Sequence, residues 1–167
     1  MKSRELINGE KQKVLAIARH FLQCYLSSRD GLKELQILRS ERLLQGDYAE
    51  WLVAQVLDLK LEQSQTEKAI DARDERGRTY QIKSRIVKNL TQNTSFDLRT
   101  IDDRFDFLVP VFFNKSFEVL AMLKVPYEVV RELGYQTSST FRFRWNSKVA
   151  TDERIEKIIW EDEISGC

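Results

Sequence analysis

The sequence predicts an α/β domain with a mixed central sheet and an N-terminal helical extension, and three observations lead to this prediction. Apolar residues recur at helical spacing over the first third of the chain. The middle third changes to the alternation and turn residues of a β-hairpin, and two further apolar runs follow it. We place the helical extension at residues 1–45 and the α/β domain at residues 46–167.

Helical periodicity predicts the elements before residue 59. Apolar residues spaced three and four apart indicate a first helix over residues 4–27, and Ser28–Gly31 is typical of a turn. The leucines of residues 32–43 predict a second helix or two short helical pieces. A third helix is expected to begin at Asp47 and to end near Asp58.

Strand patterns dominate the rest of the chain. After a short strand at Leu59–Leu61, strands at residues 69–73 and 80–83 flank Asp74–Arg78, where Gly77 can take a positive φ, so a hairpin is expected. The elements expected after the hairpin are a short helix after Ser95, strands at Phe105–Phe113, Phe117–Lys124 and Phe141–Trp145, a helix from Pro126 to Leu133, and a final helix at Asp152–Trp160.

Composition predicts a cytoplasmic protein. A hydrophobic share of 42% and a charged share of 32% are typical of a globular chain and exclude extensive disorder. No apolar run approaches the roughly 20 residues that span a bilayer, and Met1–Glu5 lacks the apolar core of a signal peptide. Cys24 and Cys167 have no metal-ligand companions and are expected to be free thiols.

The net charge of +1 conceals a basic middle segment, in which only Asp97 opposes six Lys and Arg residues between Arg76 and Arg99. Such a segment can bind a polyanion, although solvated faces of mixed charge are the commoner cause of one cluster. The side chains expected to hold phosphates are Arg76, Arg78, Arg85 and Lys88.

Strand parity brings polar side chains of the hairpin together. Gln81 and Lys83 share one face of their strand because residues two apart point the same way. A three-residue loop at Arg76–Arg78 would place Asp71 opposite Lys83, with Gln81 diagonal to it. A two-residue loop would break this alignment, so the prediction depends on the turn.

Such a group suits metal-dependent hydrolysis of phosphodiesters. Mg²⁺ or Mn²⁺ prefers oxygen ligands, which the Asp71 carboxylate, the Gln81 amide and the Ile82 backbone carbonyl could supply. Lys83 could orient the attacking water or stabilise charge on the phosphoryl oxygens. Glu50, on the third predicted helix, could bind metal-bound water or a second ion.

These residues resemble the motif of the PD-(D/E)XK nuclease superfamily, in the Q-x-K form of Mrr-type restriction endonucleases. The segments Gly46–Ala54, Asp71–Ala72 and Tyr80–Arg85 are also similar to a group of small, uncharacterised bacterial proteins assigned to that superfamily. The resemblance covers roughly residues 39–145 and implies a restriction-endonuclease-like αβββαβ core with a mixed central sheet.

The resemblance also implies residue roles. It makes Glu50 the acidic helix residue, Asp71 the metal-binding aspartate, and Gln81 and Lys83 the two residues of the Q-x-K pair. Gln81 stands where many members have a carboxylate, so the site would hold a divalent ion with less negative charge. Ile70 stands where the motif has its proline.

Alternatives remain open for the same residues. Asp47 and Glu50 have the spacing of a capping box, with Asp47 at the N-cap and Glu50 at the third helical position. Asp71 and Lys83 could form a cross-strand ion pair. The leading hypothesis is a nuclease acting on DNA, in restriction or repair; the others are an inactive nuclease-fold nucleic-acid-binding protein and a structural or interaction domain. A homodimer through the N-terminal helices is also expected.

Overall fold

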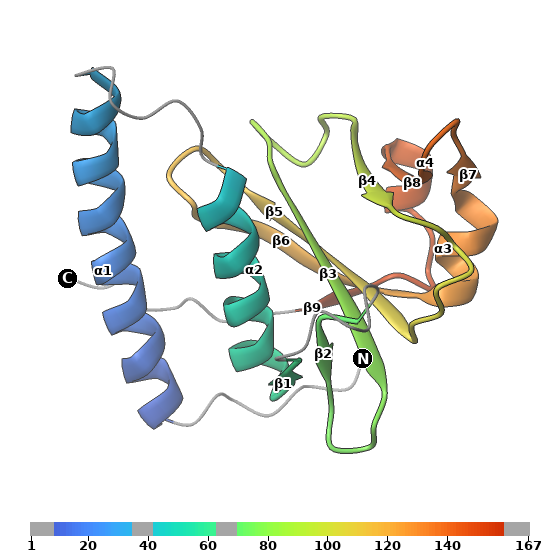
Figure 1. Cartoon of the computed structure of the whole chain (residues 1–167), viewed down its shortest axis with the longest axis horizontal. Helices are drawn as coiled ribbons and strands as arrows, with labels where there is room; N and C mark the ends of the chain where they lie inside the picture. The colour runs from blue at the N-terminus through green and yellow to red at the C-terminus, as the bar shows by residue number, and fades with distance from the viewer. Residues whose placement is uncertain (1–8, 35–41, 63–69, 159–167) are drawn as a thin grey trace. The chain divides into compact units, whose positions relative to one another are not determined.

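The computed structural model describes residues 9–34, 42–62 and 70–158 (Figure 1). The chain divides into two compact units, one of which contains helix α1 (Gly9–Glu34), whereas the other runs from Leu44 to Ile158. The second unit is an α/β fold with a mixed central sheet, as the sequence predicts. Within the described ranges, no helix is long and apolar enough to cross a membrane.

Helix α1 is longer than the sequence predicts. It continues through Ser28 and Gly31 to Glu34, so the predicted turn at Ser28–Gly31 is wrong. The Ser28 hydroxyl donates to the Cys24 carbonyl at 3.0 Å, so this serine bonds inside the helix instead of ending it. One glycine inside a helix costs about 1 kcal/mol relative to alanine, which is too little to break 26 residues of helix.

Helix α2 (Arg42–Leu57) begins five residues before the predicted start at Asp47. Most of the predicted second helix, residues 35–41, lies outside the described residues. The predicted end is confirmed: Asp58 takes a positive φ of 55°, and the Leu59 N–H donates to the Ala54 carbonyl at 2.9 Å. A left-handed residue directly after the last turn is a common way for a helix to stop.

The central sheet has six strands in the order β1-β2-β3-β5-β6-β9 (Figure 1). Strands β3 and β5 are parallel, and the other neighbours are antiparallel, which confirms a mixed sheet. The strands are β1 (Lys60–Leu61), β2 (Ala72–Arg73), β3 (Thr79–Ile86), β5 (Phe107–Phe113), β6 (Val119–Pro126) and β9 (Glu156–Ile158).

A second sheet of three strands has the order β4-β8-β7. The remaining elements are β4 (Thr94–Leu98), α3 (Tyr127–Leu133), β7 (Tyr135–Gln136), β8 (Phe141–Trp145) and α4 (Ser147–Ala150). The predicted strand at Phe141–Trp145 is confirmed, and Pro126 directly precedes α3 instead of being its first residue.

Two predicted helices are strands. The segment after Ser95 is β4, where buried Phe96 and Leu98 alternate with polar neighbours and pair with β8. The predicted final helix is wrong as far as residue 158, because β9 pairs with β6 and forms an edge of the central sheet; residues 159–160 lie outside the described part. The connection between β3 and β5 therefore carries a strand where the αβββαβ order would have a helix.

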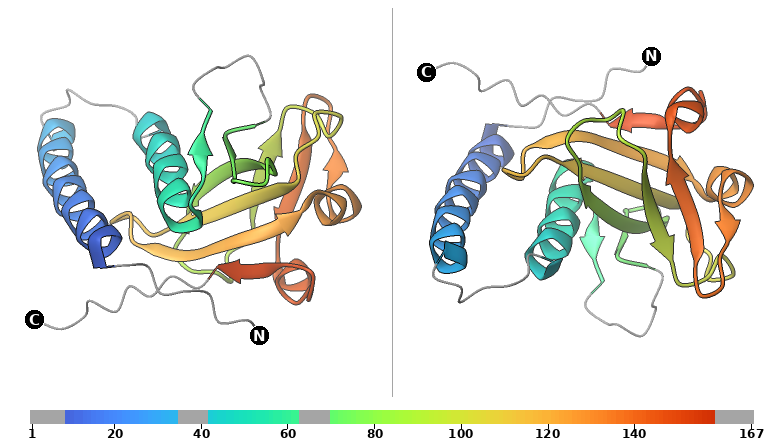
Figure 2. Two further views of the ribbon diagram at one scale, coloured as in Figure 1. Left: turned by 90° about the horizontal axis from the view of Figure 1, so that it is seen from below. Right: turned by 90° about the horizontal axis from the view of Figure 1, so that it is seen from above.

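Consecutive residues of β5 separate the two faces of the central sheet. The Phe113 ring lies 5.6 Å from Tyr48 of α2, whereas Phe112 lies 5.3 Å from Phe96 of β4 and 5.2 Å from Trp145 of β8. Since neighbouring strand residues point to opposite faces, α2 covers one face and the three-stranded sheet covers the other (Figure 2). The core between the two sheets includes fully buried Phe96, Phe112 and Phe143.

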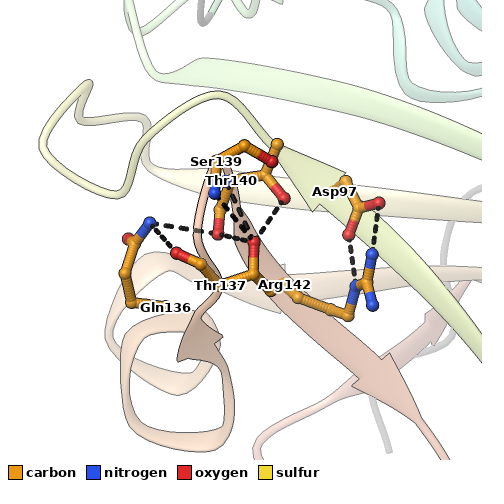
Figure 3. Close-up of polar contacts among 6 residues, drawn as sticks. All are labelled: Asp97, Gln136, Thr137, Ser139, Thr140 and Arg142. Carbon is orange, nitrogen blue, oxygen red and sulfur yellow. Dashed lines mark hydrogen bonds and ion pairs between the residues drawn. The ribbon is translucent and has the colours of Figure 1, made fainter.

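A cross-strand ion pair and a polar turn fix the small sheet (Figure 3). Arg142 donates to the two Asp97 carboxylate oxygens at 2.7 and 3.0 Å from the directly opposed position of β8. The Thr137 N–H and hydroxyl both donate to the Thr140 carbonyl at 2.8 Å, which closes the turn between β7 and β8. The buried aromatic residues of β8 are thereby held against the core.

Replacing Gly134 with alanine is expected to destabilise this unit by about 1–3 kcal/mol, as overpacking does. A Cβ at Gly134 would overlap the Phe141 ring and would lie 2.7 Å from the Val130 carbonyl oxygen, which is part of the backbone and cannot move aside without distorting α3. Urea unfolding checks this. The control is Gly46→Ala in α2, where a Cβ meets nothing within 4 Å and a gain of about 0.5–1 kcal/mol is expected. Equal stability of both variants would contradict the packing argument.

Candidate functional site

The β2–β3 hairpin has the predicted loop length but a different register. The loop residues are Glu75–Gly77, closed by the Asp74 N–H to the Arg78 carbonyl at 3.1 Å, with Gly77 at a φ of 76°. The Asp74 carboxylate accepts the backbone N–H groups of Arg76 and Arg78 at 3.0 and 2.9 Å, and this Asx-type turn starts the loop at Asp74.

The register is set by this loop. Ala72 pairs with Tyr80, so Asp71 lies beside Gln81, and the predicted position of Asp71 opposite Lys83 is wrong by two residues. Gln81 and Lys83 share one face of β3 because residues two apart point the same way. A change of register by two residues leaves the faces of the partner strand unchanged. The two side chains therefore remain on the same side of the sheet near Asp71.

Asp71 lies where β2 and β3 separate. Its N–H donates to the Tyr80 carbonyl at 2.8 Å, and its Oδ2 accepts the Ile82 N–H at 2.6 Å. In the described residues β2 pairs with β3 only through Ala72 and Arg73, so the Asp71 carboxylate takes the place of the next backbone acceptor. The N–H and C=O of one strand residue face the same neighbour, which puts the Ile82 carbonyl on the Asp71 side of β3.

Helix α2 carries Glu50 and approaches this region from the face of the central sheet that α2 covers. The Gln45 side chain donates to the Ser84 hydroxyl at 3.1 Å, which holds the first turns of α2 on β3. Glu50 is half-buried, and the charges of Asp71 and Lys83 both reach its carboxylate. Of the four predicted site residues, Asp71 and Lys83 lie close enough to Glu50 for their charges to shift its pKa, and Gln81 is buried on the same strand as Lys83.

The two carboxylates repel one another. Burial, followed by the negative charges of Asp71 and Asp47, raises the pKa of Glu50 from 4.5 to about 7, and Lys83 opposes this increase. Burial also raises the pKa of Asp71 above 3.8, while the Ile82 N–H and Lys83 lower it. Two carboxylates with raised pKa values beside one lysine form a site whose charge is incompletely balanced.

The described residues show neither a capping box at Asp47 nor an ion pair between Asp71 and Lys83. The capping box is wrong: α2 begins at Arg42, so Asp47 and Glu50 lie well inside the helix. Asp47 instead adds negative charge beside Glu50, a role that the sequence did not indicate. An ion pair between Asp71 and Lys83 is not found in the part of the chain that the structure describes.

The donor set suits a hard cation but carries little negative charge. Glu50, Asp71, the Gln81 amide and the Ile82 carbonyl are all oxygen donors, and a divalent ion would relieve the repulsion between the carboxylates. Only two of the four carry charge. Over residues 9–34, 42–62 and 70–158, no group of three or more His, Cys, Asp or Glu side chains is placed to hold a metal.

The four predicted phosphate-binding residues do not form one cluster. Arg76 and Arg78 lie at the hairpin end of β3, whereas Arg85 and Lys88 lie at its other end, about 23 Å away at 3.3 Å per residue. Arg78 is held by Asp74 at 2.6 Å, and Arg85 lies over the Phe96 ring at 5.6 Å. These residues therefore flank the carboxylate site on two sides of it.

The sequence did not indicate a cavity of about 620 Å³ near the start of β3. Its walls come from the hairpin, the loop before β5 and the start of α3, which lie up to fifty residues apart in the chain. Its charged lining residues include Arg104 and Asp106, which belong to no motif recognised in the sequence.

Comparisons with models of known protein families and with curated proteins gave no match.

Proposed function

We propose that this chain is a metal-dependent nuclease that hydrolyses DNA phosphodiester bonds, as enzymes of restriction or repair do. The observation that carries the proposal is that Asp71, where β2 and β3 separate, and Lys83 lie within electrostatic reach of Glu50, with buried Gln81 on the same strand as Lys83. The mixed sheet with β3 parallel to β5 supports a restriction-endonuclease-like core, in which β4 replaces the connecting helix.

Mg²⁺ or Mn²⁺ would be held by Asp71, the Gln81 amide oxygen and the Ile82 carbonyl, with Glu50 through water or at a second ion. When bound, such an ion lowers the pKa of water and polarises the phosphate. It would also be the counter-charge that the two carboxylates lack.

The protein groups then have separate tasks. Glu50, whose carboxylate lies within reach of the Asp71 and Lys83 charges, accepts a proton from the attacking water. The Lys83 ammonium stabilises the negative charge that grows on the phosphoryl oxygens. The basic residues Arg76 and Arg78 at one end of β3, and Arg85 and Lys88 at the other, hold the phosphates on either side.

One observation favours a second candidate, an inactive nuclease-fold protein that still binds nucleic acid. Gln81 supplies a neutral amide where a carboxylate would bind a cation more strongly, and its side chain is only 4% exposed. Weak metal binding would remove cleavage and leave phosphate contacts intact. The salt dependence of DNA binding would then be retained without any cleavage.

Nicking of supercoiled plasmid DNA by the wild-type chain tests the proposal. We expect conversion to open circles with Mg²⁺ or Mn²⁺ and none in EDTA, because both carboxylates need the cation to act together. Gel electrophoresis over time gives the rate. A chain that binds the plasmid with a salt-dependent affinity but does not nick it with either ion would establish the second candidate instead.

The expected homodimer through the N-terminal helices stays a prediction. Helix α1 exposes four large apolar side chains spaced three or four residues apart, which places them on one side of the helix: Val14, Ile17, Phe21 and Tyr25. These residues define the surface at which a second copy would pack.

A further inference from the structure

A cavity of about 620 Å³ opens where β3 and β5 begin and where β6 passes into α3. Its volume lies within the range of small-molecule sites in proteins. All of its lining residues belong to the unit Leu44–Ile158. Thr79 in its wall is two residues from Gln81 and four from Lys83 on the same strand, or roughly 7 and 13 Å.

Flat groups form the walls of this cavity. The Arg104 guanidinium lies 5.1 Å over the Tyr127 ring, and the Arg78 guanidinium lies 5.6 Å over the Phe107 ring. Tyr127 is held in place because its hydroxyl donates to the Ile101 carbonyl at 2.8 Å. A guanidinium on an aromatic ring is a planar cationic surface on which another planar group can stack.

The edges of the cavity carry both donors and acceptors. The donors are Arg78, which also donates to Asp74 at 2.6 Å, and Arg104, which donates to Glu128 at 3.4 Å. The carboxylates of Asp106 and Glu128 are the acceptors, so the lining charges balance. Oδ2 of Asp106 accepts the N–H and the hydroxyl of Thr79 at 2.7 and 2.9 Å, which fixes this carboxylate at the cavity wall. Balanced charge does not favour a bare phosphate, whereas a neutral planar heterocycle has donors and acceptors in its own plane.

We propose that the cavity binds one unpaired nucleobase of a nucleic-acid strand whose backbone reaches the carboxylate site. Stacking on the Arg104–Tyr127 pair supplies the affinity, and Asp106 and Glu128 receive the amino groups of the base. The separation of roughly 7–13 Å along β3 corresponds to a few nucleotides. The identity of the ligand as nucleic acid rests on the proposed function, and it names the substrate as a strand with an accessible base.

Binding of a single-stranded oligodeoxynucleotide containing 2-aminopurine tests this site in EDTA, where no metal takes part. We expect its fluorescence to be quenched on binding, and Arg104→Ala to weaken binding about tenfold, the usual cost of losing a stacking partner. Arg104→Lys, which keeps the charge and loses the plane, should bind as weakly as the alanine variant. Arg99→Ala removes another exposed arginine, outside the cavity, and should bind normally.

The outcomes separate this site from the proposed nuclease activity. Quenching that depends on Arg104, in a chain that does not nick plasmid DNA, would support the base site and contradict the nuclease. Nicking by a chain in which Arg104→Ala binds and quenches normally would overturn the base site alone. Full rescue by Arg104→Lys would also overturn it, because charge without a planar group would then be sufficient.

Discussion

Lys83→Ala is expected to lower the rate of metal-dependent nicking by about 10²–10³-fold, the cost of removing one group that stabilises transition-state charge. Lys83 lies on β3 two residues from buried Gln81, and its charge reaches both Glu50 and Asp71. Without it, the repulsion between the two carboxylates is opposed by one positive charge less. The proton affinity of Glu50 would then increase further.

Rate measurements at saturating Mn²⁺ distinguish a chemical role for Lys83 from simple DNA binding. A loss in turnover with little change in the DNA concentration for half-maximal rate indicates charge stabilisation in the transition state. Lys148→Ala on α4, an exposed lysine on the three-stranded side of the fold, is the matched control and should cleave at the wild-type rate. Unaltered nicking by Lys83→Ala would remove Lys83 from the site.

Local chemistry predicted the hairpin well because its signals lie within a few residues. Gly77 takes the positive φ that the sequence indicated, and the loop has three residues. The register differs because the Asp74 side chain accepts two backbone N–H groups of its own loop and moves the loop by one residue. Strand parity survived this change, so the sequence still predicted which residues of β3 share a face.

The errors arose where long-range contacts override local pattern. The segment after Ser95 is a strand because it pairs with Phe141–Trp145, more than forty residues away, and no local window contains that partner. Likewise, Asp47 has the chemistry of an N-cap, but Gln45 packs on Ser84 and extends α2 toward its N-terminus. Tertiary packing decides the ends of such elements.

The sequence could indicate the members of the candidate site but not their electrostatics. Glu50 is twenty-one residues from Asp71 in the chain, and its pKa depends on how deeply α2 buries it beside that aspartate. The cavity beside Tyr127 could not be predicted for a similar reason: Arg104 is twenty-three residues from Tyr127, and the stacked pair exists only once β6 turns into α3. The spacing of residues along the chain does not predict the burial of Glu50 beside Asp71 or the contact between Arg104 and Tyr127.

Glu50→Gln is expected to stabilise the metal-free protein above neutral pH and to weaken its stabilisation by metal. The pKa of Glu50 is about 7 in the folded chain against 4.5 ordinarily, so the folded state holds this proton more tightly. The free energy of unfolding therefore falls as pH rises from about 4.5 to about 7, and this cost remains at higher pH. Because solvent screens a half-buried group, the gain on substitution at pH 8 is about 1–2 kcal/mol.

Metal should reverse the order of the two proteins. Mn²⁺ stabilises only a folded chain that binds it, so a melting temperature that rises with Mn²⁺ in the wild type should rise less in Glu50→Gln, which keeps Asp71 but loses one of the two charged donors. Thermal unfolding at pH 5 and pH 8, in EDTA and in Mn²⁺, measures both effects, and the advantage of the variant in EDTA should shrink at pH 5. If Glu50 only stabilised α2, Glu50→Gln would lower the melting temperature under every condition. A Glu50→Gln chain less stable than the wild type at pH 8 in EDTA would thus contradict a site built around repelling carboxylates.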